Sequence, residues 1–343
     1  MVRIETGNDV VLRHIVCEYA IANNVWIKAS MAAEQIPKRH HFVPKMLQKH
    51  FVTQEGGLWT YDHRRREHTV WCGKPEGLLL QGHLYSHLYE DGSKNTELEA
   101  WFSQLESVAA PIVEKILAAA RLWRTPGLTA TERADWDFFF YQQFRRVPDL
   151  YESLLTPEQH RVQVEKHLDA FSKHVRPVTN RERSDMLNPA NLKRMYRNLR
   201  VSSLKTGSDN VLDVISARGL AVCRIPNPKK SFVLGSRPVI KLTTPETSDL
   251  SDGRVELWLA VAPDVMVGIG PPGKHEVIVD ISDKNVRCLN EGIAAQSSQI
   301  IGRSKQLITS LAPYVGLKVG KSPLPEEWDE LWVDDFKQDA QPS

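Results

Sequence analysis

Cysteine is scarce in this chain, and its spacing excludes several kinds of site. The 343 residues hold four cysteines, and no two of them form a C-x-x-C pair. Zinc ribbons and thioredoxin-like redox motifs both need that pair, so neither is predicted. We interpret the four thiols as reduced and mostly structural, which is typical of a cytoplasmic protein.

Long apolar runs are also lacking. The most apolar N-terminal stretch, residues 10–27, is interrupted by Arg13, His14 and Glu18. A secretory signal needs an unbroken apolar core, and a spanning helix needs about 20 apolar residues, so the sequence predicts neither. We therefore expect no membrane partner and a cytoplasmic location.

The motifs that identify many enzymes are absent as well. The sequence holds no H-E-x-x-H, H-x-x-E-H, Walker A loop, dinucleotide fingerprint or G-x-S-x-G elbow. Residues 268–273 are rich in glycine, but Pro271 and Pro272 remove amides that a phosphate cradle needs. No cofactor is predicted, and a divalent metal enters only if the chain is a nuclease-like enzyme.

What remains is an ordinary globular composition with a clear order of elements. Hydrophobic residues make up 41% and charged residues 25%, enough for a large core. Strand-like segments, then helices, then more strands favour an α+β fold. We expect an N-terminal β-hairpin with strands, a central helical bundle, and a C-terminal, mostly antiparallel sheet with a late helix; the respective ranges are 58–89, 95–217, 220–280 and 283–301.

Three regions are predicted: an extension at 1–34, a single α+β domain at 35–320, and an acidic tail at 321–343. In the tail, Trp328, Trp332 and Phe336 recur every fourth residue, as on one face of a helix. This apolar stripe either docks on the body of its own chain or binds a partner. As a third reading, the acidic tail covers a basic helix and is autoinhibitory.

Histidine is concentrated in one stretch: seven of the twelve lie between His40 and His87. Histidine is a common metal ligand and proton carrier, so this density invites a site. The segment 81–89 alternates like a strand, which separates His83 from His87 by about 13 Å and disfavours a zinc site. His40 and His41 remain, either as a general base or phosphate contact, or as hydrogen-bonding anchors of the chain.

A second candidate is a polar pair on a helix that is apolar almost all round, residues 132–147. Gln143 and Arg146 lie one turn apart, and a buried arginine needs a partner, for which Glu106 is the obvious choice. The three either form a structural network, or Arg146 grips a phosphate or carboxylate. Asn290 either orients a ligand or caps within the core.

The charge of the chain is unevenly distributed. Residues 173–205 carry nine Lys or Arg against two acids, while residues 325–343 carry seven acids against one lysine. The helix predicted at 189–205 is either a solvated face or a weak site for nucleic acid or another anion. Its candidate residues are Lys193, Arg194, Arg197 and Arg200.

Several short motifs, in order, resemble the uncharacterised family called domain of unknown function 4238. The motifs are Lys38-x-His40-His41-x-Val43-Pro44-x-x-Leu47-x-x-x-Phe51, Leu58-Trp59-x-Tyr61-Asp62, Leu105-Glu106-x-x-Ala109-x-Pro111-Ile112, Gln143-x-x-Arg146-x-Pro148, Pro263 and Leu289-Asn290. The resemblance covers roughly residues 38–304 and implies a bacterial or phage-associated protein, with a role in conflict or defence as one reading. Where it leads us to expect Ser-Asp-Asn-Pro-Val, this chain has Ser236 in place of the aspartate.

Two functions stay open. The first, favoured by Ser236 and by the lack of a metal constellation, is a non-catalytic sensor or interaction protein that binds an anionic ligand such as nucleic acid. The alternative is a nuclease-like phosphate-ester hydrolase. There, His40 or His41 would be the acid or base, and Arg146 with Gln143 would hold the anion.

Overall fold

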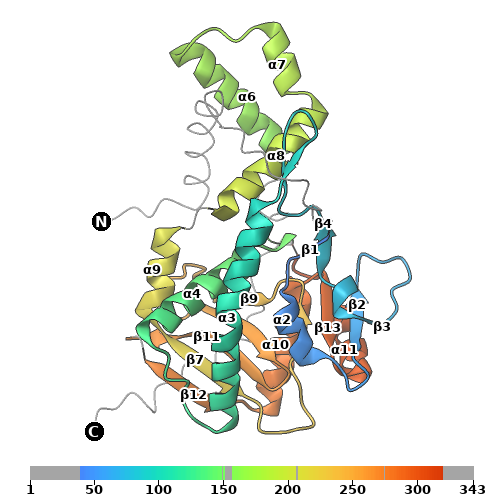
Figure 1. The fold of residues 1–343 in the computed structure, drawn as a ribbon, viewed down its shortest axis with the longest axis vertical. Coiled ribbons are helices and arrows are strands. Elements are labelled where there is room, and N and C mark those ends of the chain that lie inside the picture. Colours follow the sequence, from blue (N-terminus) through green and yellow to red (C-terminus); the bar gives the residue numbers. More distant parts are fainter. Residues whose placement is uncertain (1–38, 149, 151–156, 206–207, 274, 320–343) are drawn as a thin grey trace. The chain divides into compact units, whose positions relative to one another are not determined.

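The computed structural model describes residues 39–148, 150, 157–205, 208–273 and 275–319 (Figure 1). The predicted N-terminal extension and the tail with Trp328, Trp332 and Phe336 lie outside these residues. The chain divides into two compact units. The first, the helical unit, comprises described residues 83–99 and 157–205; the second, the sheet unit, comprises the other described residues.

The helical unit combines helices with one short strand pair. Its elements are β5 (His87–Leu88), β6 (Lys94–Asn95), α6 (Pro157–His174), α7 (Asn180–Met186) and α8 (Pro189–Lys205). The side chain of Asn198 fastens α8 to β5, because its Oδ1 accepts from the Leu88 amide at 2.9 Å and its Nδ2 donates to the Leu88 carbonyl at 2.8 Å. The residues of α8 buried in this unit are Val201 and Leu204.

A five-stranded sheet is the centre of the sheet unit. Its order is β12-β7-β11-β10-β9, with β12 parallel to β7 and the other pairs antiparallel. Strands β7 and β10 are buried along almost their whole length, as expected for a sheet covered on both faces. The bounds are β7 (Arg218–Arg224), β9 (Val239–Leu242), β10 (Glu256–Ala262), β11 (Val265–Pro272) and β12 (Glu276–Asp280).

Two smaller sheets complete the strands of this unit. The four-stranded sheet has the order β3-β2-β13-β8, and a two-stranded ladder joins β1 to β4. All of these pairs are antiparallel. The bounds are β1 (Arg39–His41), β2 (Leu58–Asp62), β3 (Trp71–Gly73), β4 (Leu80–Gly82), β8 (Leu234–Gly235) and β13 (Gln299–Gly302).

Helix α4 packs against β9 of the five-stranded sheet and against α9 (Figure 1). A capping box starts α4, since the Thr129 hydroxyl accepts from the Glu132 amide and the Glu132 carboxylate accepts from the Thr129 amide. Glu276 of β12 ties down the connection before α4 by accepting from two amides, at Gly127 and Leu128. The helices are α2 (Lys45–Gln48), α3 (Glu97–Arg121, within this unit from residue 100), α4 (Ala130–Arg145), α9 (Asp209–Ala217), α10 (Asp283–Gln296) and α11 (Lys305–Leu311).

The predicted α+β class is confirmed, and two element predictions are wrong. The expected strand 81–89 is interrupted, because His83 has a φ of +52° and its carbonyl accepts from the Ser86 amide in a turn. The expected helix 283–301 ends at Gln296, since Ser297 is extended and residues 299–302 form β13. Among the described residues, no helix has both the length and the apolar character to cross a membrane.

Candidate functional site

Arg146 follows the last turn of α4 and is completely enclosed. Its Nε donates to the Phe42 carbonyl at 2.9 Å, and its Nη2 donates to the His41 carbonyl at 3.1 Å and to Glu106 Oε1 at 2.7 Å. The guanidinium also lies 4.6 Å from the ring centroid of Phe102. Its side chain is 0% exposed, against 26% for Glu106, so this arginine joins β1, α3 and α4 from within.

His41 lies beside that network and is half-buried. Its Nε2 is 3.1 Å from the Pro75 carbonyl, which only accepts, so Nε2 carries the proton and Nδ1 keeps a lone pair in the neutral ring. Burial lowers the pKa of His41, and the charges of Lys45 and Arg146 lower it further, against the Pro75 bond and Glu106. The ring is therefore neutral at pH 7 and has the form of a general base.

The other nominated residues are more deeply buried. His40 is 0% exposed and pairs with Gln81 across β1 and β4. Gln143 is also 0% exposed, and among the described residues neither atom of its amide has a hydrogen-bond partner. Asn290 of α10 accepts from the Val233 amide at 3.0 Å and donates to the Ser231 carbonyl at 2.8 Å.

The structure thus brings His41, Glu106 and Arg146 together, with Gln143 one helical turn from Arg146. The amide of Asn290 is occupied by the backbone segment before β8 instead. Three of the hydrogen bonds of Arg146 go to the protein itself.

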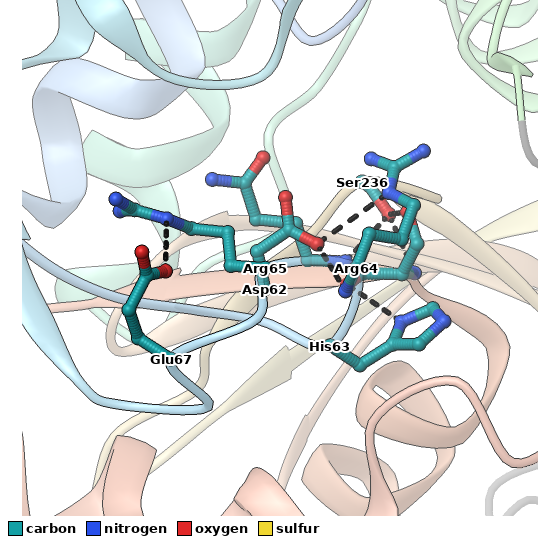
Figure 2. Close-up of polar contacts among 8 residues, drawn as sticks. Asp62, His63, Arg64, Arg65, Glu67 and Ser236 are labelled. Atoms are coloured by element: carbon teal, nitrogen blue, oxygen red, sulfur yellow. Dashed lines mark hydrogen bonds and ion pairs between the residues drawn. The ribbon is translucent and has the colours of Figure 1, made fainter.

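The side chain of Ser236, which stands where an aspartate is expected, accepts hydrogen bonds from the backbone. Its hydroxyl oxygen accepts from the amides of Ser298 at 2.9 Å and Gln299 at 3.1 Å, and it is 0% exposed. Figure 2 shows Ser236 near the turn after β2, where Asp62 accepts from the amide of Arg64 at 2.9 Å. Ser236 therefore supplies the acceptor for two backbone amides at the start of β13.

The basic residues of α8 are mostly fixed within the helical unit. Arg194 pairs with Glu90 at 2.8 Å, Arg197 donates to the His83 carbonyl, and Arg200 donates to the Leu84 carbonyl at 3.0 Å. Of the four nominated residues, Lys193 is the exposed one. These arginines hold the segment 83–90 against the helix, which leaves Lys193 as the most accessible charge of the predicted stripe.

Sequence reasoning missed a pair of cations on β9 and the residues just before it. Lys241 is part-buried, and its pKa is lowered by burial and then by the positive charge of Arg237, while Asp249 acts in the opposite direction. Arg237 lies 5.6 Å from the ring centroid of Phe144 on α4. The available signal was the alternation of Arg237, Lys241 and Thr243 every second or fourth residue, which puts them on one strand face.

Thr243 belongs to the same face and is 7% exposed. Its hydroxyl is buried and has no hydrogen-bond partner among the described residues. Elsewhere in the described part of the chain, no three His, Cys, Asp or Glu side chains gather closely enough to hold a metal ion. The arrangement on β9 is thus one of nitrogen and hydroxyl donors.

Comparison with known proteins gives a family. The model of the family described as Protein of unknown function (DUF4238) matches residues 39–306. This chain belongs to that family. The match spans β1 to the start of α11, so it includes His41, Glu106 and Arg146. No curated protein and no solved structure matches significantly.

Proposed function

We propose that this member of the DUF4238 family is a non-catalytic sensor or interaction protein that binds an anionic ligand through Arg237 and Lys241. The observation that carries the proposal is that Arg237, two residues before β9, lies close enough to Lys241 on β9 to lower its pKa, while the Lys241 ammonium also donates to the Ser248 carbonyl. Like charges that are partly removed from water repel, and an anion between them removes that cost.

Two further features support this site. The Thr243 hydroxyl is a buried donor on the same face, and the Lys241 backbone is already fixed by the Gln296 amide, which bonds its N–H at 3.2 Å and its carbonyl at 3.0 Å. A preorganised strand loses little conformational entropy on binding. A phosphate or sulfate group has acceptor oxygens for both cations and the hydroxyl.

The non-catalytic part of the proposal is supported by how the nominated groups are used. Arg146 donates three hydrogen bonds within the protein, Ser236 accepts two, and both sides of the Asn290 amide bond backbone. A cytoplasmic location goes with the proposal, as do nucleic acid as one anionic ligand and a setting in bacterial or phage conflict. Plating of phage on cells with and without the gene tests that setting.

The experiment is calorimetric titration of the full chain with inorganic phosphate, and then with a short single-stranded oligonucleotide. Arg237→Gln and Lys241→Gln should each weaken binding, while the exposed Lys229→Gln should not. Binding should also weaken with added salt, since it is electrostatic. Undiminished affinity in the folded Arg237→Gln, Lys241→Gln double variant would overturn the proposed site.

A second candidate function, phosphate-ester hydrolysis, is favoured by one observation, the neutral His41 with an oriented ring. Labelled DNA, RNA and nucleotides are incubated with the chain, with and without divalent metal. Turnover that disappears in folded His41→Gln would establish this candidate and refute the non-catalytic proposal. Absence of turnover under all conditions would leave His41 as an anchor of the Pro75 turn.

A further inference from the structure

A pocket of about 490 Å³ opens where the turn before β2 meets the β2–β3 hairpin. Its volume falls within the usual range of roughly 300–1,000 Å³ for small-molecule sites. Neither Arg237 nor Lys241 lines it, so it is separate from the proposed anion site. The lining residues are Thr53, Glu55, Gly56, Gly57, Trp59, Cys72, Gly73 and Lys74.

One wall of the pocket is aromatic, and the residues around it include glycines, which have no side chain. Trp59 of β2 pairs with Cys72 of β3, and Gly57 and Gly73 flank them. A Cβ on Gly57 would come within 2.4 Å of the Cys72 Sγ, so glycine is needed for the thiol to lie against the main chain there. The result is a flat, mostly apolar surface beside an indole ring, with an exposed thiol at its edge.

Charged side chains of both signs lie at this surface. Lys74 lines the pocket, and the Lys305 Nζ lies 5.1 Å from the centroid of the Trp59 ring. Glu55 is the opposing charge; hydrogen bonding to Thr53 lowers its pKa, so it is ionised at neutral pH. One ammonium group and one carboxylate therefore line the pocket, and a second ammonium group, that of Lys305, lies over the Trp59 ring outside the lining.

We propose that this pocket binds a nucleoside phosphate, with the base against Trp59 and the phosphate held by Lys74 and Lys305. An indole surface stacks with any base because every base has a π-face. The lysines supply point charges for the phosphate. The same chemistry is offered by a free nucleotide and by a nucleotide within a single strand.

Cys72 gives a local readout, because its thiol lines the pocket and is exposed. The full chain is alkylated with iodoacetamide, and modification of Cys72 is followed by mass spectrometry of its peptide. We expect adenosine monophosphate to slow this modification, with weaker protection by adenosine and none by inorganic phosphate. An oligoadenylate arm distinguishes the sources: protection by the oligomer at lower concentration than the monomer indicates a strand, and the reverse indicates a free nucleotide.

Four variants give the proposal its sharpest test. Trp59→Leu should weaken protection by roughly 5- to 150-fold, the loss expected for one base–aromatic stack. Lys74→Gln should weaken it and Glu55→Gln should strengthen it, because these change the charge at the pocket in opposite directions. The remote Lys229→Gln should leave it unchanged. No protection of Cys72 by any adenine ligand, or equal protection in all four folded variants, would overturn the proposal.

The outcome is separable from that of the anion site on β9. Protection of Cys72 should persist in the Arg237→Gln, Lys241→Gln double variant, because those residues lie outside the pocket. Loss of protection in that variant would mean that one site explains both results, and the present assignment of the pocket would then be wrong.

Discussion

The carboxyl group of Glu256 on β10 should make the stability of this protein depend on pH. Its Oε2 accepts from the indole Nε1 of Trp258 at 2.6 Å. Burial raises the pKa of Glu256 to about 7, from an ordinary value of 4.5, against the opposing effects of that hydrogen bond and of Arg218. The residue keeps some exposed surface, but its carboxyl group is enclosed, and the carboxyl is the group that titrates.

The sign of this pH dependence follows from the number of protons bound by the folded and unfolded chains. Between pH 4.5 and about 7 the folded chain holds a proton that the unfolded chain has lost, so the free energy of unfolding falls as pH rises. This contribution is fully present below pH 4.5 and is lost above about pH 7. A difference of about 2.5 units corresponds to roughly 3 kcal/mol. The depressed pKa values of His41, His50 and His160 act in the opposite direction, so the wild-type curve alone does not isolate Glu256.

Glu256→Gln isolates the effect, because glutamine keeps an acceptor for Trp258 and does not ionise. In urea denaturation followed by circular dichroism, the variant should match the wild type near pH 5 and exceed it near pH 8 by about 2–3 kcal/mol. Glu246→Gln, an exposed carboxylate, is the matched control and should show no such gain. A Glu256→Gln protein that is no more stable than the wild type at pH 8 would refute the reasoning.

Four further substitutions, at three positions, test the hydrogen-bond networks of these side chains. Arg146→Met should cost about 2–4 kcal/mol in urea denaturation, because it leaves Glu106 and two carbonyls without their donor. Ser236→Ala should cost about 1–2 kcal/mol by the same measurement, since two buried amides lose their acceptor, and Ser236→Asp should produce no hydrolysis of labelled nucleic acids. Arg197→Gln should speed amide hydrogen exchange in residues 83–88, and the salt dependence of nucleic-acid binding should stay unchanged. A weaker salt dependence in this variant would instead indicate that α8 is the anion site.

Periodicity was sufficient to predict most of the architecture. The range of α8 was predicted to the residue, and its start is marked by Pro189. The late helix was overextended because Ser297, Ser298 and Gln299 do not break a helical pattern. What ends it is tertiary: the Ser236 hydroxyl takes the amides of Ser298 and Gln299, and β2 pairs with β13.

The strand prediction for residues 81–89 is wrong because of a local backbone conformation that the composition does not indicate. His83, Tyr85, His87 and Tyr89 recur at every second residue as in a strand, yet His83 occupies the left-handed region that residues other than glycine rarely adopt. The Arg197 guanidinium holds the His83 carbonyl, and the Ser86 amide donates to the same carbonyl. Contacts from α8, more than 100 residues away in sequence, therefore decide a backbone conformation that no short pattern can reveal.

The candidate site shows a related limit on what residue type can predict. Arg146 and Arg197 were nominated as anion ligands because of their charge. Arg146 donates to two main-chain carbonyls and to Glu106, and Arg197 donates to a main-chain carbonyl. Arg237 and Lys241 carry the same charges in an unremarkable stretch of sequence and influence each other directly, and Lys241 uses an N–H of its ammonium on the Ser248 carbonyl. The deciding quantity is how many donors of a cation are already used inside the fold, and a guanidinium with five N–H groups can be used up by carbonyls without any acidic partner in the sequence. A functional assignment for this family should therefore begin from donors that the fold leaves accessible, rather than from the most basic helix or the most buried arginine.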